Sequence, residues 1–218
     1  MTGLHVDSVM KSFDSKQILT DIFLSCKKGE IIGLLGRNGS GKSTLLKIIF
    51  GSLPAERKFI KAEGKILNNL FQSHKLIKYL PQFSFLPNHI KVNTIIDLFC
   101  VKESSELIKA NKLFKYLLNK RSKELSGGEK RLLEIFLIVY SDAKYILIDE
   151  PFNGIAPIYK NEIKEIIIEQ SQHKGFVLTD HDYRNILDIA TKLIMIYDGG
   201  TRIVKNTDDL INLGYLPF

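Results

Sequence analysis

GRNGSGKST, residues 36–44, is the stretch that decides the fold of this chain. It fits the pattern GxxxxGK followed by Ser or Thr, in which glycines let backbone amides curl around the α- and β-phosphates of a nucleotide at the start of a helix. The flanks agree, because the apolar run IIGLL at residues 31–35 precedes the motif and an apolar helix is expected over residues 44–50. The stretch therefore predicts a buried strand, a phosphate-binding loop and a helix in succession.

The alternative for this stretch is a glycine-rich turn without a ligand. Lys42 argues against it, because a cation at the start of a helix opposes the helix dipole unless an anion lies between them. We therefore expect Lys42 to reach the β- and γ-phosphates and the hydroxyl of Ser43 to ligate magnesium. The residues expected to contact the nucleotide here are Gly36, Asn38, Gly39, Ser40, Gly41, Lys42, Ser43 and Thr44.

A pair of carboxylates follows a second buried strand. YILIDE, residues 145–150, places Asp149 and Glu150 at the carboxyl end of that strand, where ligands bind in open α/β sheets. Adjacent carboxylates there need a cation, so we expect Asp149 to support magnesium, directly or through water. Glu150 is the candidate general base that polarises the attacking water. The alternative is a solvated acidic turn ahead of Pro151.

A second glycine-containing segment, LSGGE at residues 125–129, precedes an apolar helix. The hydroxyl of Ser126 and the amides of Gly127 and Gly128 would form another helix N-terminus able to bind an anion. Alone, this segment is a weak signal, since any capped helix can show it. Located just ahead of the Asp149 strand it is strong, and one chain then carries two phosphate sites.

These three segments, in this order and with this spacing, resemble the motifs of the ATP-binding cassette (ABC) family. The resemblance extends over residues 4 to about 205. The resemblance implies an ATP hydrolase that uses ATP and Mg²⁺, with Asp149 and Glu150 in the two roles just given. It also implies that two subunits pack head to tail, the Ser126 loop of one closing over the γ-phosphate held by Lys42 of the other. Glu129 stands where a glutamine is common in the family.

Three further positions follow from the same resemblance. Gln82, in YLPQ, matches a glutamine that contacts magnesium and links the core to a helical subdomain; by itself it would be a surface residue. His181, in TDHD, matches the switch histidine that contacts the γ-phosphate, although a lone histidine is more often structural. Phe13 matches an aromatic residue that stacks on adenine, although an aromatic in a strand is more often core.

Periodicity places the chain in the α/β class, with a mostly parallel sheet flanked by helices. Short runs rich in Ile, Leu and Val, apolar on both faces, recur between amphipathic stretches. Residues 4–28 and 64–79 alternate instead, which predicts an antiparallel β subdomain. Residues 94–123 have helical spacing. We expect a single domain, residues 1–218, in which residues 90–125 form a short inserted helical subdomain.

Bulk properties restrict where such a chain works. It has 44% apolar and 25% charged residues, no segment typical of a signal peptide and no apolar run near the roughly 20 residues of a membrane helix. The net charge of +7 is spread along the chain without interleaved aromatics, so a solvated surface is favoured over a surface that binds anionic lipid headgroups or nucleic acid. Two distant cysteines predict neither a disulfide nor a zinc site. We expect a cytoplasmic protein, peripheral on the inner face of the cell membrane.

The leading hypothesis is the ATPase subunit of a membrane transporter, partnered by transmembrane permease subunits and by itself or a closely related cassette subunit. The alternatives are a soluble cassette ATPase that drives assembly or remodelling, and a nucleotide-sensing dimeriser with little turnover. Ala156, where the family usually has aspartate, puts communication between the two ATP sites in doubt, and the segment between Gln82 and Ser126 is short. The EPF and TDH pieces are similar to lipopolysaccharide-export and branched-chain amino-acid cassettes.

Overall fold

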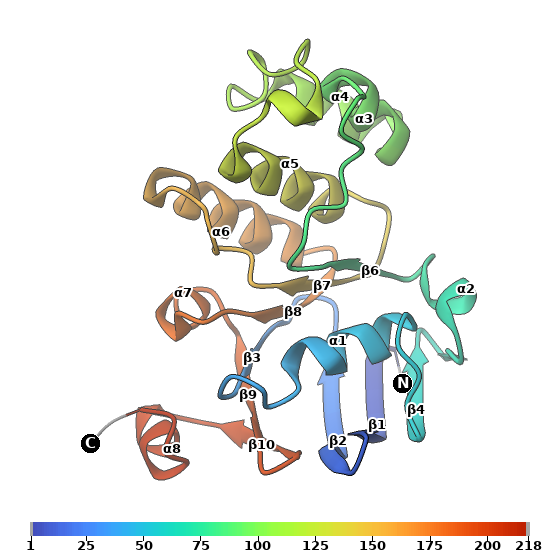
Figure 1. The fold of residues 1–218 in the computed structure, drawn as a ribbon, viewed down its shortest axis with the longest axis vertical. Helices are drawn as coiled ribbons and strands as arrows, with labels where there is room; N and C mark the ends of the chain where they lie inside the picture. Colours follow the sequence, from blue (N-terminus) through green and yellow to red (C-terminus); the bar gives the residue numbers. More distant parts are fainter. Residues whose placement is uncertain (1, 217–218) are drawn as a thin grey trace.

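The computed structural model describes residues 2–216, and within them a mixed β-sheet is flanked by helices (Figure 1). The strand order is β5-β4-β1-β2-β10-β9-β3-β8-β7-β6. The strands are β1 (Leu4–Phe13), β2 (Lys16–Cys26), β3 (Ile31–Leu35), β4 (Arg57–Ala62), β5 (Lys65–Ile66), β6 (Ile77–Leu80), β7 (Tyr145–Asp149), β8 (Gly175–Thr179), β9 (Lys192–Tyr197) and β10 (Gly200–Val204). The predicted α/β class is confirmed.

The core of the sheet is parallel. Strand β3 pairs with β8 and β9, and β7 pairs with β8 and β6, all in parallel. Every residue of β3, β7 and β8 is buried, as expected for runs that are apolar on both faces. Because these strands run the same way, their carboxyl ends meet at one edge, which is where the candidate site forms.

The antiparallel part is smaller than predicted. Strands β1, β2, β4 and β5 pair antiparallel, but the predicted antiparallel stretch at residues 64–79 does not continue beyond β5. A short helix, α2 (Leu70–Ser73), intervenes, and β6 then joins the core sheet parallel to β7. The alternating apolar and polar residues of this stretch did not reflect its burial, because the two buried residues of β6, Ile77 and Leu80, lie three positions apart. Gln82 therefore follows a core strand.

Helices cover both faces of the core sheet. Besides α2, the α-helices of the described residues are α1 (Lys42–Phe50), α3 (Val92–Phe99), α4 (Lys102–Ala110), α5 (Gly127–Val139), α6 (Pro157–Ser171), α7 (Tyr183–Leu187) and α8 (Thr207–Asn212). Along β3, Ile32 and Leu34 pack in the apolar cluster that contains α1, whereas Ile31 and Leu35 pack in the cluster that contains α5 and α6. Of the helices within residues 2–216, none has both the length and the apolar character needed to cross a membrane.

The helical prediction for residues 94–123 is only partly right. Helices α3 and α4 occupy its first half, at the end of the molecule farthest from β1 and β2 (Figure 1). Residues 111–120 instead form successive hydrogen-bonded turns, one of them initiated by the Asn111 side chain, which accepts from the Leu113 amide at 2.9 Å. Phe114 and Leu117 are buried by these turns without lying on an α-helix.

The two cysteines lie in protected surroundings. Cys26, at the end of β2, is fully buried and its thiol donates to the Phe176 carbonyl on β8 at 3.5 Å. Burial raises the pKa of Cys26 to about 12 and that of the half-buried Cys100 to about 11. Both thiols therefore stay protonated at neutral pH, and neither forms a disulfide.

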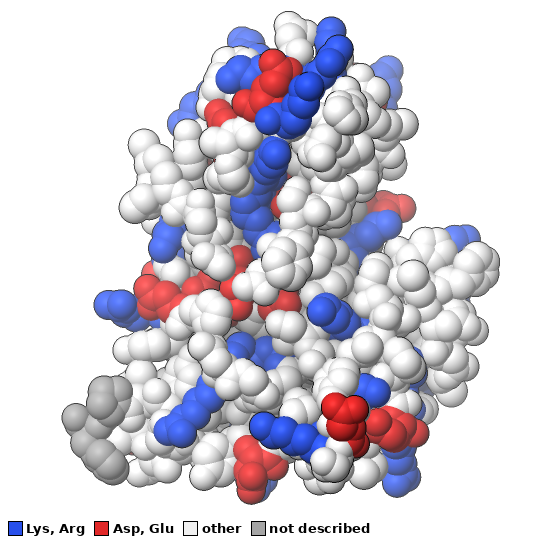
Figure 2. Space-filling model, viewed as in Figure 1, with Lys and Arg blue, Asp and Glu red and all other residues white. Residues whose placement is uncertain are grey.

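Side chains of one charge sign do not gather into a single patch on the face drawn in Figure 2. Lysines and arginines are interspersed there with aspartates and glutamates. The arrangement on this face is that of a solvated surface.

Candidate active site

The loop after β3 is shaped by glycines. Gly41, which caps α1, has φ 99°, and a Cβ atom there would lie 2.7 Å from Leu19 and 2.9 Å from Ile18. A larger residue here would have to adopt a left-handed backbone and displace the side chains of Leu19 and Ile18. Helix α1 has neither a side-chain cap nor an acidic residue in its first turn. Within the described part of the chain, the amides of Lys42, Ser43 and Thr44 have no hydrogen-bond acceptor, so this helix N-terminus can bind an anion.

Lys42 supplies the matching positive charge. Its side chain folds back over the loop, and Nζ donates to the carbonyls of Gly36 at 2.6 Å and Arg37 at 3.2 Å. Only 9% of the residue is exposed. Burial lowers the pKa of Lys42, while the nearby carboxylates of Asp149 and Glu150 oppose that shift. A buried cation beside unpaired amides suits a polyphosphate.

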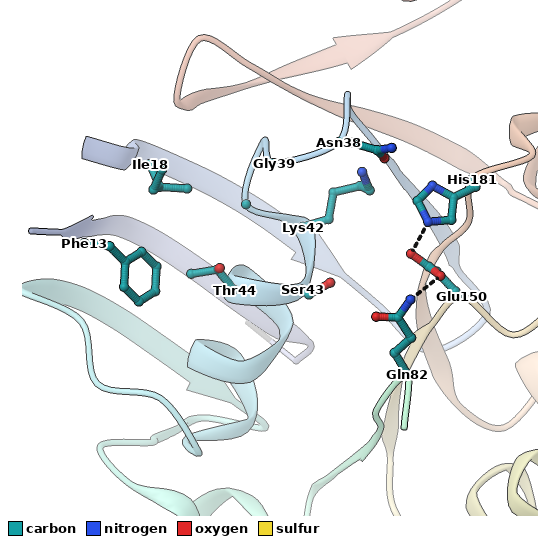
Figure 3. A pocket seen from close by; sticks show the side chains of 11 residues that line it. Phe13, Ile18, Asn38, Gly39, Lys42, Ser43, Thr44, Gln82, Glu150 and His181 are labelled. Carbon is teal, nitrogen blue, oxygen red and sulfur yellow. Dashed lines mark hydrogen bonds and ion pairs between the residues drawn. The ribbon is translucent and has the colours of Figure 1, made fainter. Parts of the chain in front are cut away.

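A cavity of about 440 Å³ opens over this loop (Figure 3). It brings together side chains from the antiparallel strands, the phosphate-binding loop and the ends of β6, β7 and β8. Its lining residues are Phe13, Ile18, Asn38, Gly39, Gly41, Lys42, Ser43, Thr44, Gln82, Glu150 and His181. Gly36 and Ser40 do not line it; Gly36 holds Lys42 through its carbonyl, and the Ser40 hydroxyl is buried beside Gly36.

Glu150 is the focus of the cavity. Its Oε2 accepts from Gln82 Nε2 at 2.9 Å and from Asn153 Nδ2 at 3.2 Å, and its Oε1 lies 2.7 Å from His181 Nε2. Figure 3 shows Gln82 and His181 converging on this carboxylate. Glu150 has φ 53°, a left-handed backbone that is unfavourable for a non-glycine residue and that its amide supports by donating to Thr179.

Asp149 lies one step deeper. It is 2% exposed, and its two carboxylate oxygens accept from Thr179 Oγ1 at 2.7 Å and from Tyr79 at 3.2 Å. Burial, reinforced by the charge of Asp149, raises the pKa of Tyr79, so the phenol remains a donor. A hydroxyl at Ser43, the amide oxygen of Gln82 and the carboxylate of Asp149 are hard oxygen donors of the kind that Mg²⁺ prefers. The residues present therefore fit magnesium together with a nucleotide.

The LSGGE segment forms a separate feature. Ser126 caps α5 by accepting from the Glu129 amide at 3.2 Å, and the Glu129 side chain accepts from the Ser126 amide at 2.8 Å. Gly127 lines a second cavity of about 300 Å³, whereas none of Ser126, Gly127, Gly128 and Glu129 lines the cavity over Lys42. The N-termini of α1 and α5 thus lie at different cavities, and the α5 terminus is capped by the chain's own side chains.

Four residues that hold the carboxylates in place were not predicted from the sequence. Tyr79, Asn153 and Thr179 bond to the two carboxylates, and Arg131 donates to the carbonyls beside them. Asn153 lies three positions after Glu150, a spacing that could have suggested a shared turn. For Arg131 and Thr179 the sequence offers no signal, because their role depends on which strands and helices become neighbours.

Comparisons with known proteins agree with this geometry. A family model described as "ABC transporter" matches residues 19–153. A lipopolysaccharide export system ATP-binding protein, LptB, from Haemophilus influenzae is 30% identical over 97% of this chain and 94% of its own length. A sulfate/thiosulfate import ATP-binding protein, CysA, from Bacillus cereus is 28% identical, and the match covers 99% of this chain and 65% of that protein.

Solved structures share the fold. The ATP-binding subunit of an ABC transporter superposes with a TM-score of 0.86 at 21% identity, over 100% of this chain and 95% of that one. An ATP-binding cassette of an ABC transporter in its ADP conformation gives a TM-score of 0.72 at 26% identity, over 97% of this chain and 94% of that one.

Proposed function

The chain belongs to the ABC transporter family as an ATP-binding and ATP-hydrolysing subunit, and from that premise we propose that two copies close head to tail around ATP to power transmembrane permease subunits. The observation that carries the proposal is the separation of the two anion-binding helix N-termini. Lys42 and its amides face one cavity, and Ser126 lies outside it. A second subunit that brings its Ser126 loop to this cavity would complete the site.

The residues around the cavity have distinct proposed roles. Glu150 accepts the proton of the attacking water, a role that typically contributes about 10²–10⁴-fold in rate. Gln82 and His181 hold the two oxygens of that carboxylate in place, and His181 also faces the γ-phosphate. Lys42 offsets phosphate charge. Phe13 stacks on adenine at the far end of the same cavity.

Magnesium would be held by the hydroxyl of Ser43, by Gln82 and, directly or through water, by Asp149. When bound, the ion neutralises charge on the phosphate oxygens. Thr179 and Tyr79 would keep the Asp149 carboxylate oriented through the hydrogen bonds described above.

The proposed partners are permease subunits in the cell membrane, with this chain on the inner face. The relatives above are named for export of lipopolysaccharide and for import of sulfate or thiosulfate, so the family resemblance leaves both the cargo and the direction of transport open. A soluble cassette ATPase that drives assembly of a cytosolic complex is the alternative.

Glu150→Gln tests the proposal directly. The amide preserves the shape of the side chain and one acceptor oxygen but cannot accept a proton, so ATP should still bind while turnover falls by about 10²–10⁴-fold. Because ATP then persists between subunits, the variant should become dimeric when ATP is added, as measured by size-exclusion chromatography with light scattering. A variant that stays monomeric under saturating ATP would contradict head-to-tail closure.

Lys42→Ala is the matched control. It should lose ATP affinity itself, so neither dimer formation nor turnover should respond to ATP. Tight ATP binding by this variant would contradict the assignment of the phosphate-binding loop.

A further inference from the structure

Arg131 and Glu134 are two charged residues buried in the first turns of α5. Their side chains are 9% and 1% exposed, and Arg131 Nη1 lies 3.6 Å from Glu134 Oε2. Burial lowers the pKa of Arg131, and Glu134 is the main charge opposing that shift. Buried ion pairs are costly to desolvate and are often dispensable for stability, so the role of this pair lies in the groups that it contacts.

The guanidinium of Arg131 bonds to three main-chain carbonyls on two different strand ends. It donates to Pro81 at 2.6 Å, to Asp149 at 2.5 Å and to Glu150 at 3.2 Å. Pro81 immediately precedes Gln82, so one planar side chain fixes the backbones of both residues whose side chains meet at the 2.9 Å hydrogen bond between Gln82 and Glu150.

Glu134 holds the other side of Gln82. One of its carboxylate oxygens accepts from Ser84 Oγ at 2.5 Å and from the Phe85 amide at 3.0 Å. The segment that carries Gln82 is therefore anchored before it by Arg131 and after it by Glu134, two residues one helical turn apart on α5. Helix α5 begins at the Ser126 cap, so both anchors belong to the helix that starts the second anion-binding segment.

We propose that Arg131 and Glu134 are a positioning pair that sets Gln82 against Glu150 and links the Ser126 end of α5 to the hydrolytic site. The proposal rests on the functions proposed above for Gln82 and Glu150. Neither member of the pair lines the cavity over Lys42, although both line the second cavity, so the pair acts on the Lys42 cavity through the backbones that it holds. A shift of α5 would move the carbonyls of Pro81, Asp149 and Glu150 together. A movement of the Ser126 loop at the start of α5 would therefore change the position of the Glu150 carboxylate.

Arg131→Lys is the test in the full-length protein. Lysine keeps the charge, but a single ammonium cannot span the carbonyls that the planar guanidinium joins. Because small misplacements of catalytic groups are expensive, kcat should fall about 10- to 100-fold. The Kd for ATP should stay within about twofold, because the phosphate-binding loop is untouched. Arg202→Lys, the same exchange on an exposed strand, is the matched control and should leave both constants unchanged.

A second variant separates positioning from folding. Arg131→Met combined with Glu134→Leu replaces the buried pair with apolar side chains, an exchange that often preserves stability. Here, however, the carbonyls and the Phe85 amide lose these partners, so the melting temperature should fall; at a temperature where the variant remains folded it should keep the Kd for ATP and lose kcat as Arg131→Lys does. In addition, Arg131→Lys should lower kcat less in a Gln82→Ala background than in the wild type, since both changes disturb the contact between Gln82 and Glu150.

Two results would contradict the proposal that Arg131 and Glu134 position Gln82 against Glu150. One is an unchanged kcat in Arg131→Lys, and the other is a loss of ATP affinity that parallels the loss of kcat, which would indicate general structural damage. Glu150→Gln in the same assay distinguishes the two proposals. If it retains full turnover, the role proposed for Glu150 fails; if it loses turnover while Arg131→Lys does not, only the positioning pair fails.

Discussion

The carboxylate of Glu150 is held by side chains from three separate segments. Gln82 follows β6, His181 follows β8, and Asn153 lies in the turn after Glu150 itself. Both oxygens are therefore engaged by the protein's own side chains, and the left-handed backbone at Glu150 is stabilised by the bonds of its amide to Thr179. In the role proposed for it as general base, such a preorganised carboxylate would need little rearrangement to accept a proton.

Phe13 provides a prediction for the adenine end of the cavity. The ring is 45% exposed, lines the cavity and has Lys11 Nζ at 5.1 Å from its centroid. Phe13→Ala should weaken binding of ATP and ADP alike by roughly 1–3 kcal/mol, the range for loss of base stacking. Isothermal titration calorimetry would measure this. Phe23→Ala is the matched control, because that ring on the neighbouring strand is 47% exposed and lies outside the cavity; equal losses in both variants would contradict stacking.

Lys174 provides a pH prediction. Its Nζ is buried between the carbonyls of Val139 and Ser141, and burial lowers its pKa from 10.5 to about 8. Between those two values the unfolded chain holds a proton that the folded chain has released. The free energy of unfolding contributed by this group therefore rises with pH across that window and is flat below it. Urea titrations between these pH values should show wild type gaining stability relative to Lys174→Met; parallel profiles would count against the burial effect.

At the scale of elements, helix α6 begins with a defect. Ala156 occupies the N-cap with φ −61° and ψ 141°, its side chain makes no cap hydrogen bond, and Pro157 follows in the first turn. The family's usual aspartate at this position would supply the missing acceptor. Alanine in place of aspartate therefore removes a helix cap within the subunit, whatever its effect on contacts between subunits.

Ala156→Asp should therefore stabilise the protein. A side-chain oxygen at an N-cap is worth about 1 kcal/mol, and for a chain of this size that corresponds to a rise in melting temperature of about 2–4 °C. Differential scanning calorimetry would detect it. Ala156→Ser should give a similar gain and Ala156→Leu none, since only an acceptor helps at this exposed position. A gain with leucine would point to a different cause.

What the sequence could predict also differs by element. The strands β3, β7, β8 and β9 were predictable because their runs are apolar on both faces, and the glycine and lysine pattern after β3 defines its loop. Strand β6 was misassigned because two buried residues in four positions do not reveal whether the partner strand is parallel. The role of Arg131 could not be predicted from the sequence for a related reason: its acceptors are main-chain carbonyls, which every residue carries.

At the scale of the whole molecule, the proposed partner is a membrane protein. Affinity purification of this chain from detergent-solubilised native membranes, with and without a non-hydrolysable ATP analogue, should recover a multi-span protein identifiable by mass spectrometry. Recovery of soluble proteins alone, or of a clean dimer, would favour the assembly ATPase. The identity of the membrane partner would in turn indicate the transported substrate.

The two shielded thiols make the molecule convenient for fluorescent labelling. Maleimide dyes react with thiolates, and at neutral pH neither Cys26 nor Cys100 supplies an appreciable fraction of thiolate, given pKa values of about 12 and about 11. A cysteine introduced at Leu107, which is 61% exposed on α4, would therefore take up dye far faster than the native thiols. Movement of the segment between Gln82 and Ser126 could then be followed by the anisotropy or the environment-dependent emission of that single dye, without first replacing the native cysteines.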